Sequence, residues 1–152
     1  MADVRKILLA VELSALSAEI APWANLMGRQ FNVETHVVHV VPELDQWGVA
    51  YAVHPSHLDD RNKIIQQAEN KLADFCQQCL DPALDYRTRV IIGHPAEEVI
   101  NYIKTEGISL IIIGTHGKSG LDRAIFGSVA DRLLRFSPVP VLSVNPYTQD
   151  ID

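Results

Sequence analysis

Short runs of valine, isoleucine and leucine recur along the chain, and patterns typical of amphipathic helices separate them. Most of these runs are continuously apolar rather than alternating, which favours strands buried on both faces of a parallel sheet. We therefore expect five strands, at residues 7–11, 33–41, 88–92, 110–113 and 139–144. This alternation of strand and helix constrains the fold more than any other feature of the sequence.

The first helical pattern follows the first apolar run and precedes the second. Ser14 or Ser17 is a suitable N-cap, and Pro22 predicts either a later start or a kink. The apolar residues that we expect on its buried face follow helical spacing and are Ile20, Ala24, Met27 and Phe31.

Three further helices are expected between the remaining strands. The second spans about 58–80, and the third runs from Pro95 to its end at Gly107. The fourth begins at Gly127-Ser128 and ends before Pro138. The side chains that we expect to face the core are Ile65, Ala68, Leu72, Phe75, Cys76 and Cys79 in the second helix, Ala96, Val99, Ile100 and Ile103 in the third, and Val129, Leu133 and Phe136 in the fourth.

This order of elements predicts a Rossmann-like α/β fold with an open, mainly parallel five-stranded sheet and helices on both faces. The 152 residues suit one domain, and neither a repeat nor a linker divides them. We expect a single domain over residues 1–152, with a loose tail at 145–152. Sheets of this type bind ligands beyond the carboxyl ends of their strands, so the site should lie in the loops there.

The charge and composition exclude several classes of partner. Lys and Arg total 13 against 19 Asp and Glu, a formal charge of −6, which argues against nucleic acid and anionic membranes as partners. No run approaches the ~20 apolar residues of a membrane span. The apolar run at 7–11 is interrupted by Glu12 and is too short for a secretion signal, and the two cysteines are too few for a disulfide scaffold. These features predict a soluble cytoplasmic protein.

A glycine-rich loop follows the fourth expected strand and contains Gly114, Gly117 and Gly120. Its spacing does not fit a Walker A loop, a Rossmann fingerprint or a nucleophile elbow. The loop ends at Gly127-Ser128, where a helix N-terminus would present free N–H groups to an anion such as phosphate. Residues 114–135 carry four basic and two acidic side chains, so the charge is locally positive. The alternative is an ordinary helix cap behind a structureless loop.

The spacing Gly114-x2-Gly117-x9-Gly127-Ser128, with the apolar strands on either side, resembles the nucleotide-binding signature of the universal stress protein family. The likeness extends over nearly the whole chain. It implies an adenine nucleotide alpha hydrolase-like fold and membership of the branch that binds ATP, or ADP or AMP, with Mg²⁺ accompanying the phosphates. It also implies a homodimer that pairs through the edge strand Val139–Val144.

The resemblance also implies a set of site residues. Gly117, Gly127, Ser128 and Val129 would hold the phosphates, and the backbone of Val41 would contact adenine. The family usually has an aspartate in its first loop, whereas this chain has Glu12, which could still bind ribose or the nucleotide's Mg²⁺. The complete expected set is Ala10, Val11, Glu12, Val41, Gly114, His116, Gly117, Lys118, Gly127, Ser128 and Val129.

The function expected from these residues is regulatory or sensory nucleotide binding in a stress response. No arginine finger, Walker B acid or base for water is recognisable, so any ATP hydrolysis should be slow. The alternative is a nucleotide-free dimeric interaction module in which Glu12 marks a degenerate site. A true hydrolase is the third and weakest hypothesis.

Other candidate residues have simpler explanations. Cys76 and Cys79 share an apolar helix stripe and fit the core better than a zinc site, which would need further ligands. His36 and His39 should point to opposite faces of a strand and pack there, and His94 fits a loop. A loop cluster could bind a metal or serve as helix cap and dipole partners: His54, His57, Asp59 and Asp60.

Overall fold

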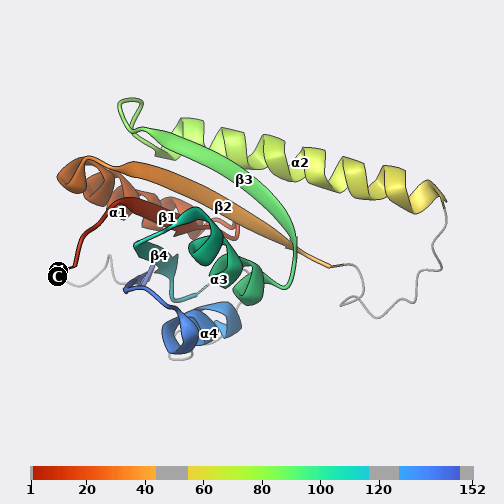
Figure 1. Cartoon of the computed structure of the whole chain (residues 1–152). Helices are drawn as coiled ribbons and strands as arrows, with labels where there is room; N and C mark the ends of the chain where they lie inside the picture. Colours follow the sequence, from red (N-terminus) through yellow and green to blue (C-terminus); the bar gives the residue numbers. More distant parts are fainter. Residues whose placement is uncertain (1, 44–54, 117–126, 148–152) are drawn as a thin grey trace.

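The fold was described from a computed structural model, which covers residues 2–43, 55–116 and 127–147, with only the backbone of 55–59. Strands and helices alternate throughout these segments (Figure 1). Each expected strand and helix is present within a few residues of its predicted bounds. The elements are β1 (Lys6–Ala10), α1 (Ser17–Phe31), β2 (Glu34–Pro42), α2 (Pro55–Cys79), β3 (Tyr86–Gly93), α3 (Pro95–Glu106), β4 (Leu110–Gly114), α4 (Ser128–Phe136) and β5 (Val141–Val144).

The sheet has five strands in the order β3-β2-β1-β4-β5, and every pair is parallel. The order reverses direction at β1, which pairs with β2 on one side and with β4 on the other. The carboxyl ends of β1 and β4 therefore flank the switch point at which such sheets bind ligands. The predicted open parallel sheet with helices on both faces is confirmed.

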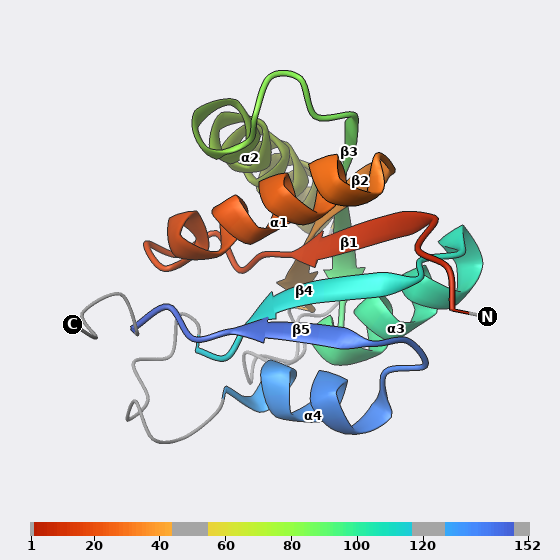
Figure 2. The same cartoon turned by 90° about the vertical axis from the view of Figure 1, so that its left-hand side faces the viewer.

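Helices cover both faces of the sheet, with α1 and α2 on one side and α3 and α4 on the other (Figure 2). The central strand β1 contributes to both cores because its side chains alternate between the faces. Ile7 and Leu9 face α1 and α2, whereas Leu8 faces α3 and α4, and all three are fully buried. This double burial explains why the strand is continuously apolar in the sequence.

The ends of two helices differ from the expectation. Phe31 and Phe136 follow helical spacing, yet their exposed fractions are 45% and 62%. Each is the last residue of its helix, α1 and α4 respectively, which places it at the end of the packed face. The prediction that both side chains pack inward is therefore wrong.

The start of α1 also differs from the prediction. Neither Ser14 nor Ser17 caps the helix, because the N-cap is Leu16, which has no side-chain cap hydrogen bond. The two serines instead stabilise the preceding turn: the Ser17 Oγ accepts from the Ser14 N–H at 3.1 Å, and the Ser14 Oγ accepts from the Leu16 N–H. Pro22 lies inside the helix, which begins five residues before it at Ser17.

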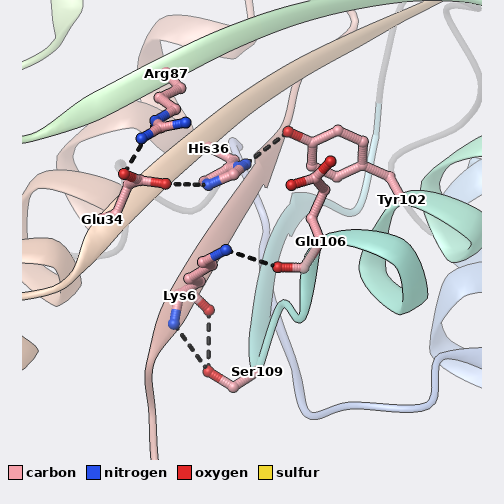
Figure 3. A network of polar contacts seen from close by, with 7 residues as sticks. All are labelled: Lys6, Glu34, His36, Arg87, Tyr102, Glu106 and Ser109. Carbon is pink, nitrogen blue, oxygen red and sulfur yellow. Dashed lines mark hydrogen bonds and ion pairs between the residues drawn. The ribbon is translucent and has the colours of Figure 1, made fainter.

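A buried polar network lies near the amino ends of the strands, on the α3 side (Figure 3). His36, which is only 2% exposed, lies 2.6 Å from the Tyr102 hydroxyl through Nδ1 and 2.6 Å from a Glu34 carboxylate oxygen through Nε2. Arg87 pairs with the other Glu34 oxygen at 3.0 Å. The hydrogen bond from His36 is the main reason that the pKa of Glu34 lies below its usual value of 4.5, although burial opposes it. This network confirms that His36 has a packing role.

At the opposite edge of the sheet from β3 lies β5, the position expected for Val139–Val144. Of the expected tail, Asn145–Tyr147 lies within the described residues, and Tyr147 packs against His116. Among the helices of the described segments, none is long and apolar enough to cross a membrane.

Candidate functional site

A cavity of about 530 Å³ lies at the carboxyl ends of β1, β2 and β4, and its wall continues onto α2 and the amino-terminal parts of α1, α3 and α4. Its volume falls within the range of about 300–1,000 Å³ that is typical of small-molecule sites. The cavity is located where the strand order predicts a ligand.

Most of the expected site residues come together in this cavity. Gly117 and Lys118 lie outside the described residues, and Ser128 begins α4 with an exposed side chain and does not line the cavity wall. The eight that line the wall are Ala10, Val11, Glu12, Val41, Gly114, His116, Gly127 and Val129.

The first loop is shaped by the sheet and by one unusual backbone conformation. The Val11 N–H donates to the Val38 carbonyl at 3.0 Å, so β1 remains tied to β2 just past its last strand residue. The backbone of Leu13 has a φ of 59°, a left-handed conformation that residues with a bulky side chain rarely adopt. This turn follows Glu12 directly, and both residues lie on the cavity wall.

The second segment of the wall joins β4 to α4. The Thr115 N–H donates to the Val144 carbonyl at 2.9 Å, and the Thr115 carbonyl accepts from the Gly127 N–H at 2.8 Å. Gly127 is the N-cap of α4 and lines the cavity, so the first turn of the helix begins there. The N–H groups of a first helical turn have no intrahelical acceptors, and together with the helix dipole they favour an anion.

His116 provides a second polar feature at this end of the cavity. Its side chain is 7% exposed, and Nδ1 lies 2.7 Å from the Thr115 hydroxyl. Its Nε2 is buried and has no hydrogen-bond partner among the described residues. Buried polar atoms are rarely left unpaired, because an unmade hydrogen bond costs about 1–3 kcal/mol. Because Nε2 is itself buried, it could reach a ligand in the cavity only if the ring or the wall shifted.

The two arginines of residues 114–135 that the structure describes, Arg132 and Arg135, do not line the cavity. Arg132 lies 3.8 Å from Glu97, Arg135 pairs with Asp131 at 3.1 Å, and neither arginine lines the cavity. The other two basic residues of that segment, Lys118 and Arg123, lie outside the described residues. In the described part of the wall, the features that favour an anion near α4 are therefore backbone N–H groups rather than arginines.

The structure also adds residues to the wall that the sequence did not indicate. His39 lines the cavity as well as packing, and its Nδ1 donates to the Val11 carbonyl at 2.8 Å. Lys71 lines the cavity from α2, remains exposed and forms no ion pair with the described residues. Strand periodicity places His39 on the same face as Val37 and Val41, and this periodicity could have identified His39 as a wall residue from the sequence. No feature of the sequence indicated that Lys71 lies on the wall, because α2 is far from the glycine loop in the sequence.

The remaining candidates do not form a second site among the described residues. Cys76 is 1% exposed and Cys79 is partly buried, both thiols are free, and burial raises the pKa of Cys76 to about 11. His94 occupies the N-cap position of α3 without a side-chain cap hydrogen bond, next to Pro95, a cavity residue. The described residues contain no group of three or more potential metal ligands. The side chains of the loop cluster, His54, His57, Asp59 and Asp60, are outside the described set except for Asp60.

Comparisons with known proteins agree with this architecture. The sequence model of the universal stress protein family matches residues 3–145. Universal stress protein YxiE of Bacillus subtilis is 30% identical over 146 residues, which cover 91% of this chain and 97% of that protein.

Two solved structures illustrate the structural likeness. The structure of protein MJ0577 superposes with a TM-score of 0.80 at 25% identity, and the match covers 93% of this chain and 96% of that chain. A universal stress protein of the same name, MJ0577, comes from Methanocaldococcus jannaschii. A universal stress family protein of Arabidopsis thaliana, solved with AMP bound, gives a TM-score of 0.59 at 13% identity over 97% of this chain and 96% of its own. From the match to residues 3–145, the chain belongs to the universal stress protein family.

Proposed function

We propose that this protein binds an adenine nucleotide in the cavity and acts as a regulatory or sensory protein rather than as an efficient enzyme. The observation that carries this proposal is the cavity of about 530 Å³ at the strand-order switch point, which includes the N-cap of α4. An anionic phosphate matches the free N–H groups of that helix end, and an apolar strand end suits a base.

Solved universal stress proteins in complex with AMP, dAMP or cAMP support the choice of an adenine nucleotide. In this chain the phosphates would lie against Gly127 and Val129, the ribose near Gly114 and His116, and adenine near Val41. Gly117, Lys118 and the Ser128 hydroxyl belong to the same proposed phosphate site.

We extend the proposal to ATP accompanied by Mg²⁺. Glu12 lines the cavity, and its carboxylate is an oxygen ligand of the kind that Mg²⁺ accepts, with phosphate oxygens and water as the other ligands. The cavity wall contains no arginine among its described residues that could serve as an arginine finger, so we expect slow turnover of ATP.

The proposal includes a cytoplasmic homodimer. The strand β5 lies at the edge of the sheet, and an unpaired strand edge is a template for pairing with a second chain. Both cysteines are free, in keeping with a reducing compartment.

The direct test is mass spectrometry of the small molecule released when the purified protein is denatured, combined with calorimetric titration of AMP, ADP and ATP-Mg²⁺. We expect an adenine nucleotide in the released fraction or a binding isotherm with at least one of the three. A protein that releases none and binds none would favour the nucleotide-free dimeric interaction module and overturn the proposal.

A further inference from the structure

One connection between the end of β5 and the cavity runs through Thr115, which itself lines the cavity. Its backbone N–H donates to the Val144 carbonyl at 2.9 Å, and its carbonyl accepts from the Gly127 N–H at 2.8 Å. The same residue therefore continues the pairing of β4 with β5 and holds the N-cap of α4. A displacement at the end of β5 would be transmitted to the helix end proposed to bind phosphate.

The side chain of Thr115 belongs to a second connection. Its hydroxyl lies 2.7 Å from His116 Nδ1, and the Tyr147 ring packs edge-on against the His116 ring with the centroids 5.1 Å apart and the planes at 66°. Tyr147 follows β5 by three residues, and it does not line the cavity, whereas His116 does. Residues on both sides thus fix one imidazole ring on the cavity wall.

His116 lines the cavity although only 7% of its surface is exposed, and its Nε2 is buried without a partner among the described residues. A buried imidazole cannot reorient freely to suit a ligand, so the position of the ring on the cavity wall must already be set by its neighbours. Thr115 and Tyr147 are the described side chains that make these contacts.

We propose that Thr115 and Tyr147 are positioning residues that orient His116 for the nucleotide, so that affinity depends on the segment after β5, Asn145–Tyr147. This inference rests on the proposed nucleotide site. Coupling between two sites is reciprocal, so a bound nucleotide would in turn hold the Asn145–Tyr147 segment more firmly against the sheet. The segment that follows the edge strand β5 would then become more ordered when nucleotide occupies the cavity.

The experiment measures AMP and ATP-Mg²⁺ affinity by calorimetry in the full chain. Aromatic pairs stabilise by an amount that corresponds to about 2- to 10-fold in affinity, so Tyr147→Ala should weaken binding by about that factor. Tyr147→Phe retains the ring and should bind like the wild type. Phe136→Ala is the matched control, because it removes an exposed aromatic side chain that does not line the cavity.

A double-mutant cycle separates positioning from general stability. In a His116→Ala background, Tyr147→Ala should have no further effect on affinity, because the ring through which it acts is absent. An equal loss in that background would overturn the inference. Thr115→Val, which removes the hydroxyl, should weaken binding, whereas Thr115→Ser should preserve it.

A spectroscopic readout in the nucleotide-free protein completes the test. The ¹⁵N signals of the His116 ring should shift in Tyr147→Ala and in Thr115→Val, and remain in place in Phe136→Ala. If the wild type binds neither nucleotide, the proposed function fails. If the wild type binds and Tyr147→Ala binds equally well, only the positioning role fails.

Discussion

Replacement of Gly127 by alanine should move stability and nucleotide affinity in opposite directions. The backbone there has φ −58° and ψ 151°, which alanine adopts readily, and an added Cβ would lie 3.6 Å from its nearest neighbour, the Thr115 carbonyl oxygen. Glycine replacements at such compatible positions stabilise by about 0.4–1 kcal/mol through the unfolded chain. For a protein of this size the melting temperature should rise by about 1–4 °C.

The same Cβ would obstruct the close approach of a phosphate to the first turn of α4. Loss of one hydrogen bond to a charged group costs about 1.5–3 kcal/mol, or about 10- to 150-fold in affinity. Thermal unfolding by circular dichroism and calorimetric titration of AMP measure the two effects on the same sample. A variant that is more stable and yet binds AMP as tightly as the wild type would refute the assignment of phosphate to this helix end.

Gly107 provides the matched control. It ends α3 with φ +69°, a left-handed conformation that disfavours alanine, and no heavy atom would lie within 4 Å of an added Cβ. Gly107→Ala should therefore lower the melting temperature without changing affinity for AMP. The pair of variants separates backbone effects on folding from direct effects on the ligand.

Three further predictions concern the polar network and the sheet edge. Tyr102→Phe leaves the buried His36 Nδ1 unpaired and should cost about 1–3 kcal/mol in urea unfolding; an unchanged midpoint would contradict this. Because the folded-state pKa of Glu34 is lowered, the wild type should be more stable than Glu34→Gln above pH 4.5, and the difference should diminish as the pH falls below it. A pH-independent difference would argue against ionisation of Glu34 as the cause. Sedimentation at micromolar concentration should give a dimer, and a monomer would exclude stable pairing through β5.

The sequence was informative about the elements because burial on both faces leaves a continuous apolar run, as in Leu110–Gly114, whose three central residues are buried. The strand order had to come from the structure, since pairing of β1 with β4 depends on packing between distant segments. Helical spacing failed at Phe31 and Phe136 for a physical reason: periodicity continues to the last residue of a helix, whereas the packed face does not.

The candidate site could be anticipated only in part. Residues at strand ends, such as Val11 and Gly114, were accessible to reasoning because parallel strands end together at one edge. Lys71 was not accessible, because its place on the wall depends on how α2 packs over β2 and β3. The contact of Tyr147 with His116 likewise arises where two strand ends lie side by side.

The pairing of β1 with β4 also bears on how the protein is synthesised. The Ser109 hydroxyl donates to the Lys6 carbonyl, a contact between residues 103 positions apart, so β1 meets its second neighbour only long after β1 itself has been synthesised. Until then the growing chain has an incomplete sheet with an unprotected apolar edge, a form prone to aggregation. The cavity needs the ends of both strands, so it exists only once β4 and the start of α4 have left the ribosome. A ligand in this cavity would therefore bind only chains whose synthesis has passed β4 and the start of α4.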